Sequence, residues 1–404
     1  MLFKLAWRNL WRNKRRSLII QLSVVVGVIA IITLDSLTNG MLYQMLFNQI
    51  STSVSYIQIH KKGFKDNKVV QNFIPDYHKA EETIKNDPLI KSYSKRVITF
   101  GLISSAVNSS GIYINGIIPD EEAKVSIIKS SVKEGKYFTG GMHEIVIGEK
   151  LAEKLEVGLG DKIVIMSNTL QGNVGSDLYR IVGLFKTFSS DFDKTNIYIP
   201  LQSAQQLLGI GDKIHEFAMI TDNYKNAPKV ASALAKQLGP KYEVLPYNEI
   251  LPLLVIQLDL YKQSSFIVTL IVSLALIFGI INTMLMAVFE RIREFGVLMS
   301  IGMKNGKLFS MIIAEAFILG VIGTVVGTAL GLLIQLLMMN SGLNLSIFAQ
   351  SLDSFGLGSI IYPVISFENT FITFLTIPIV AVIGALYPAI KAIKLQPVYA
   401  LRYV

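Results

Sequence analysis

The sequence predicts an α-helical membrane protein with four transmembrane helices and a large mixed α+β extracytoplasmic domain between helices 1 and 2. The chain of 404 residues is 51% hydrophobic and only 17% charged, and its mean hydropathy is +0.48, which is too apolar for an ordinary soluble domain. Four apolar stretches reach the length of about 17 to 25 residues that a bilayer core requires. One long stretch between the first two has the mixed polarity of a domain that buries its own core.

The N-terminal segment, residues 1–17, predicts a cytoplasmic amphipathic helix that lies in the membrane interface. Aromatic and leucine side chains fall on one helical face and basic side chains on another. We expect the interface anchors to be Trp7, Arg8, Trp11 and Arg12. A disordered basic tail is the alternative, but it leaves two tryptophans at anchor positions unexplained.

A first transmembrane helix with an outward stalk is predicted over residues 18–40. Its basic leader is long for a signal peptide and no small-residue cleavage site follows its apolar core, so we interpret it as an uncleaved span. The following domain, residues 41–260, is predicted to hold two subdomains, with an insertion at about 144–200. Its periodicity predicts strands at 53–60, 97–107, 111–118, 179–186 and 196–200, a helix at 120–133, and strand-helix-strand units at 144–165 and 216–245.

Three further spans joined by short loops make up the rest of the chain. Lysine and arginine cluster before the first span, between the second and third spans and after the last span, whereas the loop before the last span has none. The positive-inside rule therefore places both termini in the cytoplasm and the large domain in the periplasm. The predicted segments are the second helix at 261–289, a cytoplasmic helix or loop at 290–307, the third helix at 308–339, a short periplasmic loop at 340–369, the fourth helix at 370–390 and a cytoplasmic tail at 391–404.

Motifs for catalysis and phosphate binding are absent from the sequence. It contains no P-loop pattern G-x-x-x-x-G-K-[ST], no H-E-x-x-H, no G-x-S-x-G and no cysteine. The four histidines, His60, His78, His143 and His215, lack metal-ligand spacing, and we expect them to be solvated. We therefore predict a non-catalytic chain that binds no metal or cofactor. Because the net charge of +9 gathers beside the spans, we expect no nucleic-acid partner.

A charged cluster follows the second span directly. Residues 290–303 read E-R-I-R-E-F-G-V-L-M-S-I-G-M, which predicts a short amphipathic helix parallel to the membrane. Such a helix can insert apolar side chains into a groove of a partner and place charges at the rim. A tight turn whose charges only fix the topology is equally compatible with these residues. The side chains concerned are Phe295, Val297, Leu298 and Ile301 for the groove, and Arg291, Arg293 and Glu294 for the rim.

Two features of the third span require partners. Gly323, Gly327 and Gly331 form a face of small residues, which we expect to pack against the second or fourth helix of the same chain, with a dimer contact as the alternative. Glu315 lies inside the span, where an ionised carboxylate is costly unless it is paired. We expect a structural contact with the basic loop at 291–307, with a role in transport as the alternative.

Three segments together resemble one family. The pattern E-R-x-R-E-x-G-x-L-x-S-x-G at 290–302 resembles the coupling-helix signature of the FtsX-like, MacB-type (type VII) ABC transporter permeases. Residues 5–17 resemble the N-terminal amphipathic helix of that family, and residues 387–402 resemble its C-terminal tail, although Gln396 replaces the usual acidic residue. The resemblance implies a non-catalytic subunit docked on an ATPase that binds ATP and Mg²⁺. The ATPase-coupling residues that it implies are Glu290, Arg291, Arg293, Glu294, Phe295, Gly296, Leu298 and Gly302.

Within that family the chain is most similar to the lipoprotein-releasing system permeases of the LolC/LolE type. Residues 111–122 are similar to their N-G-I-D-P-x-x-E segment, whereas the L-A-x-x-L…G-D pattern within 147–162 is shared with macrolide exporters. The resemblance implies extraction of lipoprotein cargo from the bacterial inner membrane, on the apolar faces of helices 1 and 2. It implies as partners a cytoplasmic ABC ATPase dimer, a second permease copy or paralogue, and a periplasmic lipoprotein chaperone. The alternatives are macrolide-type tripartite efflux, mechanotransmission to a periplasmic enzyme, and a receptor or sensor that transports nothing.

Overall fold

The computed structural model describes residues 7–8, 14–354 and 356–394. Trp7 and Arg8 are exposed, whereas Trp11 and Arg12 lie outside the described residues, so the predicted interfacial helix stays a prediction. The chain divides into two compact units, which we call the helical unit and the sheet unit. The helical unit is Met1–Tyr43, Leu258–Asn344 and Ile360–Val404, and the sheet unit is Gln44–Gln257 and Leu345–Ser359.

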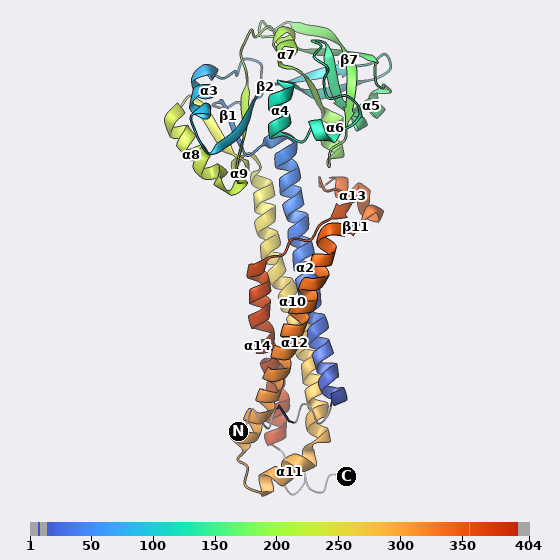
Figure 1. Ribbon diagram of the computed structural model, residues 1–404, viewed down its shortest axis with the longest axis vertical. Helices are drawn as coiled ribbons and strands as arrows, with labels where there is room; N and C mark the ends of the chain where they lie inside the picture. Colours follow the sequence, from blue (N-terminus) through green and yellow to red (C-terminus); the bar gives the residue numbers. More distant parts are fainter. Residues whose placement is uncertain (1–6, 9–13, 355, 395–404) are drawn as a thin grey trace. The chain divides into compact units, whose positions relative to one another are not determined.

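Four long apolar helices run through the helical unit in the part of the chain that the structure describes (Figure 1). Each is long and apolar enough to cross a bilayer, so the prediction of four spans is confirmed. The connections between them include the short helix α11 (Ile292–Ser300) and the strand pair β11 (Leu343–Asn344) and β12 (Ile360–Ile361). The long helices are α2 (Lys14–Gln49), α10 (Pro252–Glu290), α12 (Asn305–Ser341) and α14 (Phe367–Ile393).

Helices α2 and α10 are longer than a bilayer requires. They contain 36 and 39 residues, whereas about 20 residues cross the hydrocarbon core. The additional turns follow Leu34 in α2 and precede Ser264 in α10. The additional turns of α2 begin in the segment predicted to hold an outward stalk, and the stalk itself stays a prediction.

Apolar side chains from all four long helices form the core of the helical unit. Val28 of α2, Ile280 of α10, Ala316 of α12 and Ala385 of α14 belong to one buried cluster. Small residues allow close approach at several points in this cluster, because they leave room for the facing backbone.

One mixed sheet organises the sheet unit. Among the described residues the sheet has ten strands: nine follow the order β10-β1-β9-β2-β3-β8-β5-β7-β4, and the tenth, β6, pairs with both β2 and β7. The pairs β3–β8 and β5–β7 are parallel, and the other pairs are antiparallel. The strands are β1 (Ile57–Lys61), β2 (Ile90–Ser104), β3 (Ser109–Ile117), β4 (Val132–Gly135), β5 (Glu144–Gly148), β6 (Lys162–Asn168), β7 (Val174–Phe185), β8 (Asn196–Pro200), β9 (Glu216–Thr221) and β10 (Tyr242–Pro246).

Alternation along the strands places aliphatic side chains on one face of the sheet. Ile103 and Ile112 on β2 and β3 are fully buried, while Phe100 and Tyr113 on the same strands are exposed, as the two-residue period of a strand requires. The buried face packs against short helices to form the domain core. The short helices of the sheet unit are α3 (Tyr77–Lys85), α4 (Pro119–Val125), α5 (Glu149–Leu155), α6 (Ser190–Thr195), α7 (Leu201–Leu208), α8 (Ala227–Leu238), α9 (Tyr247–Ile250) and α13 (Ala349–Ser354).

The predicted elements of the domain are largely present. Residues 196–200 form β8, and residues 216–245 contain β9, α8 and β10, as predicted. Because the strands between 144 and 200 pair within the common sheet, the division into two subdomains stays a prediction.

Two predicted elements of the domain are wrong in extent. The helix predicted at 120–133 ends at Val125, because Ser126 adopts an extended backbone. The strand predicted from Ser53 begins only at Ile57, because Ile50–Val54 form a π-helical turn.

Candidate functional site

The short helix α11 has one buried face and one exposed face. Ile292 and Phe295 point into the helical unit, and Phe295 is only 1% exposed. Arg293, Val297 and Ile301 are exposed, and they follow one another at intervals of one helical turn. Ile301 is 80% exposed. We call these three residues the α11 stripe, an apolar surface with one basic end that is accessible to a partner.

The predicted coupling residues divide between the two faces of this segment. Since Phe295 packs in the core of its own chain and Arg291 is buried, the prediction that they contact a partner's groove and rim is wrong. The pattern could not separate the faces, because apolar residues occur on both. Exposed are Glu290, Arg293, Glu294 and Gly302, half-buried is Leu298, and buried are Arg291, Phe295 and Gly296.

Arg291 forms a buried ion pair with the carboxylate inside the third span. Its Nη1 donates to Glu315 Oε2 at 3.1 Å and Oε1 at 3.2 Å, and its Nε donates to Glu294 Oε2 at 3.2 Å. The guanidinium carbon also lies 5.1 Å from the centre of the Phe295 ring. The predicted contact of Glu315 with the basic loop is therefore confirmed. It fixes the start of α11 to α12.

The glycine face of α12 packs within the chain, but against a different helix from the one predicted. A Cβ at Gly323 would lie 2.7 Å from Val24 Cγ1, and one at Gly327 would lie 2.8 Å from Val28 Cβ. Both valines belong to α2, so the prediction that this face packs against the second or fourth helix is wrong. Only glycine allows the two backbones this separation.

Large apolar side chains of α2 and α10 are exposed in the helical unit. On each helix they recur along one side, as expected for surfaces that contact lipid chains or another protein within a bilayer. These are the helices whose apolar faces were predicted to bind cargo. The exposed side chains are Leu18, Ile19, Leu22 and Val26 on α2, and Phe266, Ile267, Leu270, Ile271, Leu274 and Phe278 on α10.

A network of buried charges lies in the sheet unit beside the turn that follows α2. Arg96 Nη2 and Nε donate to the two oxygens of Glu122 at 2.7 and 2.9 Å. Its Nη1 donates to Glu216 Oε1 at 2.9 Å and to the backbone oxygen of Ser53 at 2.6 Å. Burial lowers the pKa of Arg96, but the two carboxylates outweigh burial and hold that pKa above its usual value. The network fixes the π-helical turn to β2, α4 and β9.

Sequence reasoning missed this network because its members are far apart in the chain. Glu122 and Glu216 lie 26 and 120 residues from Arg96, and no local spacing reveals such a pairing. His60 Nε2 lies 3.2 Å from Glu216 Oε2. His60 and His215 are buried, so the expectation that they are solvated is wrong, because both fill polar positions in the core.

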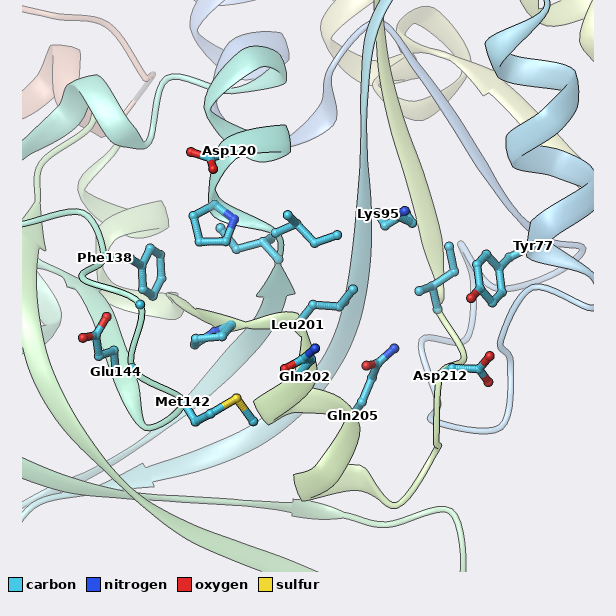
Figure 2. Close-up of a pocket in the computed structure, with 17 residues that line it drawn as sticks. Tyr77, Lys95, Asp120, Phe138, Met142, Glu144, Leu201, Gln202, Gln205 and Asp212 are labelled. Carbon is cyan, nitrogen blue, oxygen red and sulfur yellow. The ribbon is translucent and has the colours of Figure 1, made fainter.

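A cavity of about 670 Å³ lies in the sheet unit (Figure 2). Lys95, Glu144 and Asp212 line it together with apolar side chains. Lys95 Nζ lies 3.2 Å from Glu81 Oε1, and Glu144 Oε2 accepts a hydrogen bond of 2.7 Å from the Thr139 backbone. The charges of Lys95 and Glu144 therefore already have partners within the chain.

Comparison with known proteins finds similarity along the whole chain. Residues 17–237 match the family model of the MacB-like periplasmic core domain, and residues 266–397 match that of the FtsX-like permease C-terminal region. The chain is 24% identical over 420 residues to the lipoprotein-releasing system transmembrane protein LolC of Neisseria meningitidis serogroup B, covering 97% of this chain and 96% of that protein. It is 23% identical over 434 residues to the macrolide export ATP-binding/permease protein MacB of Acinetobacter baylyi, covering 99% of this chain and 59% of that protein. The solved periplasmic region of MacB from Actinobacillus actinomycetemcomitans is 17% identical, covers 51% of this chain and 95% of its own, and has a TM-score of 0.37.

Proposed function

This chain belongs to the FtsX-like, MacB-type family of ABC transporter permeases, and from that membership we propose that it couples a separate ATPase to the extraction of lipoproteins from the inner membrane for transfer to a periplasmic carrier. One observation carries the proposal: the alignment with LolC, a protein named for lipoprotein release, covers almost all of both chains. The alignment with MacB covers only 59% of a protein that is named as both ATP-binding and permease. Since this sequence contains no P-loop pattern, we assign ATP and Mg²⁺ to a partner ATPase.

The α11 stripe is the surface that we propose for ATPase docking. Val297 and Ile301 offer apolar anchors and Arg293 offers a charge at the edge, the combination that helix-in-groove contacts use. The buried pair of Arg291 and Glu315 supports this role, because it holds α11 on α12 and so allows a push on α11 to move a transmembrane helix. The basic residues beside this segment support the proposal that it lies in the cytoplasm, with both termini.

The exposed apolar faces of α2 and α10 are the surfaces that we propose for the lipid anchor of the cargo and for a second permease copy or paralogue. Lipid chains favour such surfaces, and moving a chain out of a bilayer costs about 0.8 kcal/mol per CH₂ group. A protein with several acyl chains therefore does not leave the membrane at a useful rate without an energy source. ATP hydrolysis by the partner supplies that energy.

A release assay tests the proposal. The permease and its ATPase would be reconstituted in proteoliposomes with a radiolabelled lipoprotein, and the label that reaches the soluble fraction would be measured with ATP and a periplasmic carrier protein. We expect ATP-dependent and carrier-dependent release. Absence of release together with ATPase stimulation by a macrolide would favour the efflux alternative and overturn the proposal.

The docking surface has its own test in the same complex. Replacing Val297 and Ile301 together by aspartate should abolish co-purification of the ATPase, and replacing Arg293 and Glu294 by alanine should reduce stimulated ATPase turnover, in both cases with the permease still folded and inserted. The exposed Lys229 of the sheet unit, replaced by alanine, serves as the control. Unchanged co-purification and turnover in both α11 variants would exclude this surface from docking.

A further inference from the structure

A second cavity, of about 420 Å³, lies in the helical unit between α2, α10 and α14. Its walls are mostly apolar, with Phe266, Leu274 and Ile372 among the lining side chains, and Asp35 also lines it. Asp35 directly follows the apolar stretch of α2 that ends at Leu34. The cavity therefore combines a long apolar wall with a carboxylate near the end of the span that leads into the large domain.

The carboxylate of Asp35 accepts hydrogen bonds from side chains of three helices. Its Oδ1 accepts hydrogen bonds from Ser265 Oγ at 3.0 Å and Asn369 Nδ2 at 2.7 Å, and its Oδ2 accepts one from Asn39 Nδ2 at 3.0 Å. All three donors are uncharged. Among the residues that the structure describes, no lysine or arginine forms an ion pair with Asp35. A carboxylate has about four lone-pair positions, so it has room for one more donor.

A buried hydroxyl of the cavity has no protein partner. Ser273 is 8% exposed, and within the described residues its Oγ makes no hydrogen bond. Other hydroxyls on α10, such as that of Thr269, bond back to the carbonyl four residues earlier, the usual arrangement in a helix. Ser265, Thr269 and Ser273 follow one another at intervals of four residues along α10, so the polar groups form a line down one wall of the cavity.

The dimensions of this line match a lipid rather than an ion. Eight residues separate Ser265 from Ser273, or roughly 12 Å along the helix, and the apolar wall continues to Ile277. A bare cation would require several oxygen ligands around one point, whereas the side chains that surround Asp35 present hydrogen-bond donors. A mostly apolar cavity with an anionic end is complementary to an acyl chain with a cationic head.

We propose that this cavity binds an ester-linked acyl lipid whose head carries a protonated amine. The amine donates to the Asp35 carboxylate, the acyl chain lies along the apolar wall, and the Ser273 hydroxyl donates to an ester carbonyl part-way along the molecule. Two sources have this chemistry: a membrane phospholipid with an ethanolamine head, and the free N-terminal amine of a lipidated polypeptide. The second source rests on the proposed function, and the first does not.

The test measures lipid binding to the full-length permease in detergent by native mass spectrometry. Hexadecylamine and hexadecanol share a tail and differ in the charge of the head. Because hydrogen bonds to charged groups contribute about 1.5 to 3 kcal/mol, we expect the amine to bind at least about tenfold more tightly. This comparison in the wild type needs no variant. Equal binding of the two probes would overturn the proposal.

Two substitutions assign the contacts. Asp35→Asn keeps the size of the side chain and should remove the preference for hexadecylamine while leaving hexadecanol binding unchanged. Ser273→Ala should weaken binding of lysophosphatidylethanolamine, which has an ester, about threefold or more, and leave hexadecylamine, which has none, unaffected. Retention of the amine preference in Asp35→Asn would refute the role of the carboxylate.

A further pair of probes identifies the source. Lysophosphatidylethanolamine represents the phospholipid, and a diacylglyceryl-cysteine peptide with a free N-terminus, compared with its N-palmitoylated form, represents the lipidated polypeptide. Asp35-dependent binding of either probe supports the proposal and names its source, and failure of both contradicts it. The release assay does not depend on these binding measurements, so a failure here is distinguishable from a failure of the proposed function.

Discussion

Arg291 Nη1 donates to both carboxylate oxygens of Glu315, at 3.1 and 3.2 Å, and the two side chains are each only 6% exposed. This pair joins the start of α11 to α12. An ionised carboxylate in a membrane span is costly when unpaired, and the pair removes that cost. The relationship therefore explains why a charged residue is placed where an apolar one would cross the membrane more readily.

Removing the arginine should destabilise the permease more than removing the carboxylate's charge. Arg291→Met leaves Glu315 buried without its cationic partner, and loss of one member of a buried pair costs about 3 to 5 kcal/mol. Arg291→Met should lower the unfolding temperature in detergent strongly, and adding Glu315→Gln to it should restore part of the loss. Arg293→Met, on the exposed side of α11, is the matched control. An unfolding temperature of Arg291→Met equal to that of the control would contradict the pairing.

Replacing the glycines on one face of α12 by alanine should change the unfolding temperature by different amounts at the three positions. Alanine in a helix is favoured over glycine by about 1 kcal/mol, but overpacking a core costs about 1 to 3 kcal/mol. At Gly323 and Gly327 the added Cβ would lie 2.7 and 2.8 Å from valine atoms of α2, whereas at Gly331 the nearest atoms, of Ile32, lie at 3.4 Å. Gly323→Ala and Gly327→Ala should therefore lower the unfolding temperature, while Gly331→Ala leaves it equal or higher. The same fall in all three variants would show that the face does not pack on α2 as described.

The hydrogen bonds of the Arg96 guanidinium should protect backbone amides in the turn that follows α2 from exchange with deuterium. In Arg96→Lys the charge is retained, but one ammonium group cannot reach Glu122, Glu216 and the Ser53 carbonyl together. Backbone amides of residues 50–55 should therefore exchange with deuterium faster than in the wild type, as measured by mass spectrometry of the full-length protein. Lys91→Met, an exposed substitution on the same strand, should leave their exchange unchanged. Equal exchange in Arg96→Lys and wild type would show that the turn is held by other contacts.

The sequence predicted best those elements whose signal is local. An apolar stretch as long as a bilayer is thick has few alternatives, so all four spans were found. Strand β8 was predicted with its observed ends, Asn196 and Pro200, because a short apolar stretch there follows a polar segment and ends at a proline. The helix predicted at 120–133 was too long, since the polarity of residues after Val125 fits a solvent-exposed strand as well as a helix.

Contacts between distant residues could not be predicted from patterns. The pairing of Arg96 with Glu216 depends on the antiparallel register of β2 and β9, which single-sequence periodicity does not specify. Likewise, a glycine face indicates close packing but does not identify the facing helix. The inward orientation of Phe295 depends on how α11 rotates between α10 and α12, and its apolar residues allow more than one rotation.

The segment that resembles lipoprotein-releasing permeases has a structural explanation within the sheet unit. Asn115 Nδ2 donates to the backbone oxygen of Ile197 on the neighbouring strand at 3.1 Å, Gly116 lies directly against Ala204, and Glu122 binds Arg96. These roles concern the sheet and the turn after α2. Similarity in this segment therefore indicates a shared domain architecture.

The last prediction concerns pH and the buried imidazole of His215. Its Nδ1 accepts a hydrogen bond of 3.1 Å from the Ile98 backbone amide and its Nε2 lies 3.0 Å from the Val70 carbonyl, so the neutral ring satisfies both groups. Burial lowers the pKa of His215 below the ordinary value of 6.5, although the Val70 carbonyl and Glu216 act in the opposite direction. Between the lowered pKa and 6.5 the unfolded chain binds a proton that the folded protein does not. The contribution of His215 to the free energy of unfolding should therefore be constant above pH 6.5 and should fall below pH 6.5, by up to about 1.4 kcal/mol per pH unit.

Unfolding temperatures measured between pH 5 and 8 test this prediction. The fall in unfolding temperature at acid pH should be smaller in His215→Gln than in the wild type, and it should be unchanged in His78→Gln, whose histidine is exposed. Identical pH profiles for the two variants would show that protonation of His215 does not limit stability in acid.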